Sequence, residues 1–211
     1  DIYRAMAAII WRIRPDAVSQ EQRDLAKVGT LAGVLYGEGS KGFSERTKIP
    51  QHEAEEFFQK ARRMFPELVE FQHMIIEAAR NGDEIESPFG RIYTFEYTGN
   101  DSIDSHTDRK AINASIQGTL SDICLWKFIK AQEQYGNRHI RFVNLQHDSH
   151  WTEMRFEQRF ERAAQHKAFM EDLSDLPFGA PPIPFPVSVK FGDSFGELQK
   201  WDPSMKEAVT A

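Results

Sequence analysis

Apolar residues in the first eighty positions recur every three or four residues, the spacing of one face of a helix. Ser19, followed three residues later by Gln22, has the pattern of a capping box at the start of a helix. Gly, Asn and Pro residues separate the periodic segments, because they end helices or stand in the first turn. The pattern therefore predicts helices at about residues 2–13, 19–35, 50–65 and 67–81.

The pattern changes after residue 87, where strand and helix periods alternate along the chain. Residues 93–97 alternate like a half-exposed strand, and Thr107 can cap a long helix that ends near residue 135. Strand patterns follow at 140–145 and 185–191, on either side of a charged helical stretch at 156–173. The sequence as a whole predicts an α+β fold, with helices first and a mixed second half.

Composition narrows the class of protein. With 211 residues, 40% of them hydrophobic, the chain can bury one sizeable core or two small ones. Its 26 Lys and Arg against 32 Asp and Glu give a net charge of −6, so any contact with nucleic acid must be local. Cys124 is the single cysteine, and no apolar run reaches the roughly 18 residues of a membrane span. We expect a soluble intracellular protein without a membrane partner.

Two cations lie one turn apart on the helix that begins at Ser19. Arg23, Lys27 and Leu31 are spaced four residues apart, which rotates each by only about 40° from the one before. Such a face can grip a triphosphate while a base packs alongside. The same spacing also fits two solvated cations beside an ordinary core leucine.

A polar ladder follows on the helix predicted from Thr107. Arg109, Asn113 and Gln117 repeat the four-residue spacing, and Gly118 comes directly after them. Asn and Gln both donate and accept hydrogen bonds, so this ladder suits the minor-groove edges and sugars of a duplex. Alternatively, these residues form only the solvated face opposite the apolar stripe.

A carboxylate stands where the predicted strand at 140–145 ends. His147 and Asp148 occupy a turn there, and an exposed Asp at a hairpin tip can bind a divalent metal. Magnesium usually needs more than one protein carboxylate together with substrate phosphates, so Asp148 would be part of a site. An Asp that merely stabilises the turn is the alternative.

Taken in order, these groups resemble the motifs of the family A DNA polymerases, the class of bacterial DNA polymerase I and many phage and organellar replicases. Residues 23–37 resemble the fingers helix that binds the incoming nucleotide. Residues 87–91, Ser-Pro-Phe-Gly-Arg, resemble the family's Thr-x-x-Gly-Arg turn, and 109–122 resemble the palm helix that touches primer-template. Gln146-His147-Asp148 resembles the last catalytic motif.

The resemblance implies roles for individual residues. Arg23 and Lys27 would bind the phosphates of the incoming dNTP, and Lys27 would also protonate the pyrophosphate leaving group. Leu31 and Tyr36 would flank its sugar and base, and Tyr3 stands where the family commonly has a histidine near the nucleotide. The residues expected to contact the primer-template DNA are Arg109, Asn113, Gln117 and His147. Asp148 would hold one magnesium ion (Mg2+) of a two-metal site.

The sequence departs from the family pattern in four places. Leu31 replaces the usual Phe or Tyr, and Ser149 replaces a Glu beside the catalytic Asp. One extra residue precedes Tyr36, and a π-bulge near Gly33 would absorb it. The family's first motif, Asp-Tyr-Ser-x-x-Glu, is missing, so we expect an upstream segment or a separate chain to supply the second catalytic carboxylate.

These observations together predict the C-terminal part of a DNA-directed DNA polymerase, a nucleotidyltransferase that is incomplete as this chain alone. We expect a fingers subdomain at residues 1–106 and part of a palm, with a small antiparallel sheet, at 107–211. The expected location is the cytoplasm or nucleoid of a bacterial or phage-infected cell, or an organelle. The alternative function is that of a catalytically inactive, polymerase-derived module that binds DNA.

Overall fold

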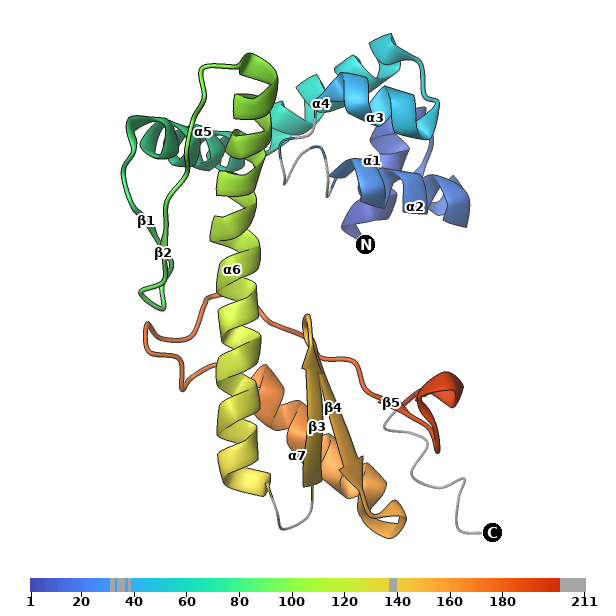
Figure 1. Cartoon of the computed structure of the whole chain (residues 1–211). Helices are drawn as coiled ribbons and strands as arrows, with labels where there is room; N and C mark the ends of the chain where they lie inside the picture. Colours follow the sequence, from blue (N-terminus) through green and yellow to red (C-terminus); the bar gives the residue numbers. More distant parts are fainter. Residues whose placement is uncertain (31–32, 34–36, 38, 137–139, 202–211) are drawn as a thin grey trace. The chain divides into compact units, whose positions relative to one another are not determined.

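The computed structural model describes residues 1–30, 33, 37, 39–136 and 140–201 (Figure 1). The chain forms two compact units, residues 1–117 and 118–211. The boundary lies within helix α6, Asp101–Tyr135, which is the longest helix. Helices together with small antiparallel sheets confirm the predicted α+β class.

Helices make up most of the first unit, and each of the four predicted segments contains one. The helices are α1 (Ile2–Trp11), α2 (Gln20–Val28), α3 (Ser40–Thr47), α4 (Gln51–Met64) and α5 (Pro66–Asn81). The helix predicted at 19–35 ends at Val28, and residues 31–32 and 34–36 of that range lie outside the described residues. The capping box is present, because Gln22 N–H donates to Ser19 Oγ at 3.1 Å and Ser19 N–H donates to Gln22 Oε1 at 3.0 Å. The sequence did not reveal α3, which buries only Phe43 and is too short to show an apolar stripe.

Three phenylalanines form the centre of the first core. The rings of Phe43, Phe57 and Phe58 lie 5.4 to 5.9 Å apart, and all three are buried. After α2, the described residues Gly29, Thr30 and Gly33 have π-helical backbone, as the extra residue in this segment predicts. A Cβ atom on Gly29 would lie 2.6 Å from the Phe43 ring, and one on Gly33 would lie 2.1 Å from Phe58. Glycine at these positions therefore lets the chain pass close to the aromatic cluster.

A second core joins α5 to α6 and to the hairpin of β1 (Ile85–Glu86) and β2 (Ile92–Tyr93). Arg80 donates from Nε and from one terminal nitrogen to the two carboxylate oxygens of Asp108, at 3.0 and 2.6 Å. The hydroxyl of Tyr97 donates to the same carboxylate at 3.0 Å. Burial, together with this carboxylate, raises the pKa of Tyr97 to about 12.

The start of α6 corrects the prediction that Thr107 caps this helix. The helix begins at Asp101, and the side chain of Asn100 accepts hydrogen bonds from the N–H groups of Ser102 and Ile103. Thr107 is buried inside the helix, and its hydroxyl donates to the carbonyl of Ile103. Asn is at least as good a cap as Thr, so composition alone could not separate the two positions.

The second unit contains a hairpin of β3 (Ile140–Gln146) and β4 (Ser149–Met154), which pair antiparallel with a bulge between Phe142 and Asn144. Helix α7 (Arg159–Glu171) follows, and then a small pair of strands, β5 (Lys190–Phe191) and β6 (Gln199–Lys200). The strand predicted at 185–191 is much shorter than expected. Pro186 has no N–H to donate to a strand partner, which favours the shorter pairing.

Candidate functional site

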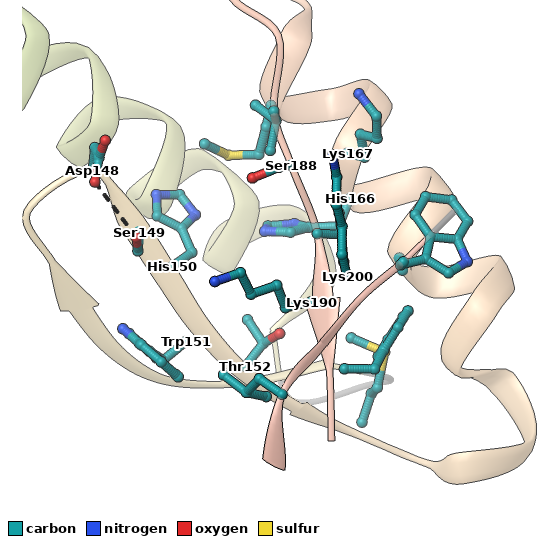
Figure 2. Close-up of a pocket in the computed structure, with 18 of the residues that line it drawn as sticks. Asp148, Ser149, His150, Trp151, Thr152, His166, Lys167, Ser188, Lys190 and Lys200 are labelled. Carbon is teal, nitrogen blue, oxygen red and sulfur yellow. Dashed lines mark hydrogen bonds between the residues drawn. The ribbon is translucent and has the colours of Figure 1, made fainter. Parts of the chain in front are cut away.

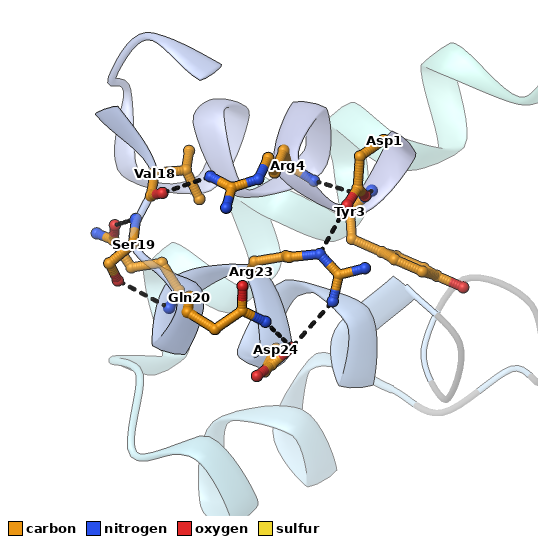
Figure 3. A network of polar contacts seen from close by, with 9 residues as sticks. Asp1, Tyr3, Arg4, Val18, Ser19, Gln20, Arg23 and Asp24 are labelled. Carbon is orange, nitrogen blue, oxygen red and sulfur yellow. Dashed lines mark hydrogen bonds and ion pairs between the residues drawn. The ribbon is translucent and has the colours of Figure 1, made fainter. Parts of the chain in front are cut away.

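The first unit brings together three of the residues expected to bind nucleotide. The Arg23 guanidinium carbon lies 5.4 Å from the centre of the Tyr3 ring, and Lys27 Nζ lies 5.9 Å from it. Both distances are within the range of a cation–π contact. Tyr3 is on α1 and the two cations are on α2, so tertiary packing creates this group; Figure 3 shows Tyr3 and Arg23. Leu31 and Tyr36 lie outside the described residues.

Side-chain hydrogen bonds hold α1 against α2 at this point. Arg4 donates to the carbonyl of Val18 at 2.6 Å, which ties α1 to the residue before the capping box. Asp1 accepts from the N–H of Tyr3 at 2.9 Å and from the side chain of Arg23 at 2.7 Å. These contacts place an aromatic ring beside two cations, an arrangement suited to an anionic ligand that also carries a flat ring.

The polar ladder on α6 also lies in the first unit. Asn113 and Gln117 are exposed and Arg109 is half-buried, at the successive four-residue spacing that the sequence predicts. Gly37, with φ of 73°, approaches this helix, and a Cβ atom there would lie 3.6 Å from Arg109 Cγ. The ladder therefore presents donors and acceptors along one helix face, which suits a long polar ligand.

The hairpin of the second unit places the predicted carboxylate at its tip. His147 and Asp148 form the two-residue turn between paired residues Gln146 and Ser149, and all four are exposed. His147 has φ of 54°, in the left-handed region that side chains rarely adopt. The Ser149 hydroxyl donates to Asp148 at 3.5 Å. The strand pattern and the turn had located this tip correctly.

Asp148 has the chemistry of a magnesium ligand, since its exposed oxygens are hard donors. In the described part of the chain, no group of three or more His, Cys, Asp or Glu side chains could hold a metal ion. One carboxylate supplies only part of the ligand set that Mg2+ requires. The donor type therefore fits the ion, but Asp148 alone does not make a complete magnesium site.

Two imidazoles, one on β4 and one on α7, lie close together, a feature that sequence reasoning missed. The rings of His150 on β4 and His166 on α7 are 5.7 Å apart, and His150 Nε2 is 3.0 Å from the carbonyl of Cys124. Burial lowers the pKa of both histidines, and together with the neighbouring His150 it brings the pKa of His166 to about 4. Both rings line a cavity of about 1800 Å³ that also borders Asp148 (Figure 2).

The family follows from comparison with known sequences. The model of DNA polymerase family A matches residues 1–197, and the chain belongs to this family. None of the helices within the described residues is long and apolar enough to cross a membrane.

Several of the relatives are bacterial DNA polymerases I. The chain is 29% identical over 133 residues to DNA polymerase I of Helicobacter pylori strain J99, covering 62% of the chain and 15% of that protein. It is 27% identical over 197 residues to the thermostable DNA polymerase I of Thermus thermophilus, covering 92% of the chain and 23% of that protein. The chain thus spans less than a quarter of the length of either relative.

A solved structure supports the fold. The polymerase domain of Pol1 from M. smegmatis, in complex with DNA primer-template and dNTP, matches with a TM-score of 0.69 and 22% identity. The match covers 81% of this chain and 31% of that domain chain. The fold of this chain is therefore that of part of a polymerase domain.

Proposed function

We propose that this chain binds dNTP and primer-template DNA in a template-dependent DNA polymerase that transfers a nucleotide to a primer 3′-hydroxyl. The observation that supports this proposal most strongly is the family match over residues 1–197, which spans every predicted site residue. A segment or partner chain with the family's first motif would supply the second catalytic carboxylate. In this proposal residues 1–106 are the fingers and residues 107–211 belong to the palm.

The nucleotide would be bound by the cations of α2. Arg23 and Lys27 would contact its phosphates, with Tyr3 beside them, and Leu31 and Tyr36 would flank its sugar and base. The centre of the Tyr3 ring lies 5.4 Å from the Arg23 guanidinium carbon and 5.9 Å from Lys27 Nζ, which supports this assignment. Lys27 is a compact ammonium that can both bind phosphate and deliver a proton to the pyrophosphate that leaves.

The duplex would be contacted by Arg109, Asn113, Gln117 and His147. The exposed amides on α6 favour this role, because minor-groove edges and sugars offer both donors and acceptors. Asp148 would hold one Mg2+ ion of the two-metal site, and the bound metals would stabilise the attacking and leaving oxygens of nucleotidyl transfer.

The nucleotide assignment is tested by equilibrium binding of a dNTP and of a primer-template to the same variants. Lys27→Ala should weaken dNTP binding about tenfold, the loss of one charge-assisted contact, and should leave DNA affinity nearly unchanged. Gln117→Ala should show the opposite pattern. Lys60→Ala, which removes a cation from α4 in the same unit, is the matched control. Equal loss of both ligands in Lys27→Ala contradicts the assignment.

Ser149 favours a second candidate, a noncatalytic module that binds DNA, because an anion usual beside the catalytic Asp is absent there. Primer extension separates the two, using a polypeptide that also carries the family's first motif. Asp148→Ala should abolish extension, whereas Asp193→Ala, which removes another carboxylate of the second unit, should not. Extension that persists in Asp148→Ala removes the catalytic role of this residue.

A further inference from the structure

We propose that Asp1 is a positioning residue of the nucleotide site, which holds the guanidinium of Arg23 in place beside Tyr3 and Lys27. The inference rests on the proposed function, because it assigns a role to a residue that acts on the phosphate-binding cation. Asp1 itself would make no contact with the nucleotide. Its negative charge would act through Arg23.

The Asp1 carboxylate has two structural tasks at once (Figure 3). One oxygen accepts hydrogen bonds from the N–H groups of Tyr3 and Arg4, at 2.9 and 3.4 Å, and so caps the first turn of α1. The other oxygen accepts from Arg23 Nε at 2.7 Å. A single carboxylate thus fixes the start of the helix that carries Tyr3 and the side chain that faces this ring.

A second carboxylate completes the arrangement. Arg23 donates from one terminal nitrogen to Asp24 Oδ1 at 3.0 Å, and Gln20 donates to the same oxygen at 3.0 Å. A guanidinium has five N–H groups, and the contacts of Arg23 with Asp1 and with Asp24 use one each. Within the described part of the chain, the two carboxylates therefore leave the larger part of the donor fork available to an anionic ligand.

Partial burial distinguishes this ion pair from the exposed ion pairs of the same unit. The side chains of Arg23 and Asp1 are 24% and 33% exposed, whereas those of Arg14 and Asp16 are 84% and 67% exposed. Fully exposed pairs contribute little, because water and salt screen them and both side chains lose freedom. The Asp1 contact is short, less accessible to water and charge-assisted, so it can restrict the guanidinium to one orientation.

The charges at this site show whether removal of the Asp1 carboxylate should weaken or strengthen dNTP binding. Arg23 and Lys27 carry two positive charges, and Asp1 and Asp24 carry two negative charges, so the four side chains sum to zero. The site would then select phosphate through the placement of its donors and not through net attraction. If charge alone mattered, removing the Asp1 carboxylate would strengthen dNTP binding. If Asp1 positions Arg23, removing it weakens dNTP binding, since the donor must be ordered again in each binding event.

Asp1→Asn isolates this effect, because Asn caps helices as well as Asp does but has no charge to pair with Arg23. We expect dNTP binding to weaken roughly three- to tenfold in Asp1→Asn, as for loss of one partly buried ionic contact. Asp16→Asn removes an exposed carboxylate from the same unit, and its dNTP affinity should stay within about twofold of the original. Circular dichroism verifies that the variants keep their helices.

A double-mutant cycle tests whether Asp1 acts through Arg23. In the Arg23→Ala background, Asp1→Asn should produce no further loss, because the side chain that Asp1 orients is gone. An undiminished loss in that background overturns the inference, as does unchanged or tighter dNTP binding in Asp1→Asn alone. Lys27→Ala measured in parallel separates the two proposals. If Lys27→Ala weakens dNTP binding and Asp1→Asn does not, the proposed function stands and only the role of Asp1 fails.

Discussion

Lys127 is a buried charge of the second unit, and its contacts allow a direct test of what stabilises that unit. The residue is 1% exposed, and its ammonium donates to the carbonyl of Asp172 at 2.7 Å and to Asp175 Oδ1 at 2.8 Å. It also lies 3.9 Å from the centre of the Phe169 ring. Asp175 is different, since 36% of its side chain is exposed and the Trp126 N–H donates to its second oxygen at 3.2 Å.

This asymmetry predicts unequal costs for removing the two partners. Asp175→Ala leaves a buried ammonium with a carbonyl and an aromatic ring but no counter-charge, and should cost about 3 kcal/mol of unfolding free energy. Lys127→Met keeps the apolar stem and leaves a carboxylate that reaches water, and should cost about 1 kcal/mol or less. The double variant should resemble Lys127→Met, because its buried charge is gone.

Urea unfolding of the three variants measures these differences. The exposed pair of Lys130 and Glu133 is the control, with side chains 40% and 61% exposed, and Lys130→Met should cost less than about 0.5 kcal/mol. A Lys127→Met variant that is as unstable as Asp175→Ala would refute the reasoning. It would mean that the ion pair itself, and not the desolvation of an unpaired charge, determines the stability of this region.

Two further predictions concern packing and pH. Gly33→Ala should lower the unfolding free energy by about 1–3 kcal/mol in urea, since its Cβ would lie 2.1 Å from the buried Phe58 ring. Gly196→Ala, where a Cβ meets nothing within 4 Å, should leave stability unchanged or raise it by less than about 1 kcal/mol, and equal values for the two variants would contradict the steric cause. For His166, the folded pKa of about 4 lies below the ordinary 6.5, so its contribution is complete above pH 6.5 and decreases by about 3 kcal/mol as pH falls toward 4. His166→Leu should flatten the stability profile in that window, and an unchanged slope would disprove this assignment.

Local signals were sufficient to predict much of the fold. Ser19 and Gln22 marked the start of α2, and the Asn81-Gly82 pair marked the end of α5, where Gly82 has φ of 80°. The start of α6 was placed too late because Asn100 and Thr107 are both acceptable caps and only burial of Thr107 separates them. The local sequence shows which residues are suited to cap a helix, but whether such a residue is buried depends on contacts with residues elsewhere in the chain.

In the candidate site, too, local sequence predicted some features, whereas contacts between distant residues could not be predicted. The four-residue spacing correctly put Arg23 and Lys27 on one helix, and a strand followed by polar residues correctly put Asp148 at a hairpin tip. The contact between Asp1 and Arg23 joins residues 22 positions apart on different helices, so no periodicity could indicate it. The pairing of His150 with His166 also depends on how a strand packs against a helix.

The left-handed backbone of His147 has a consequence for protein engineering. An L-residue with a side chain held at φ of 54° costs about 1 kcal/mol relative to glycine, so Gly or Asn at this position would make the hairpin more stable. A redesign guided by melting temperature would therefore select this substitution early. It would also delete the imidazole next to Asp148, and with it the contact with primer-template DNA that we propose for His147.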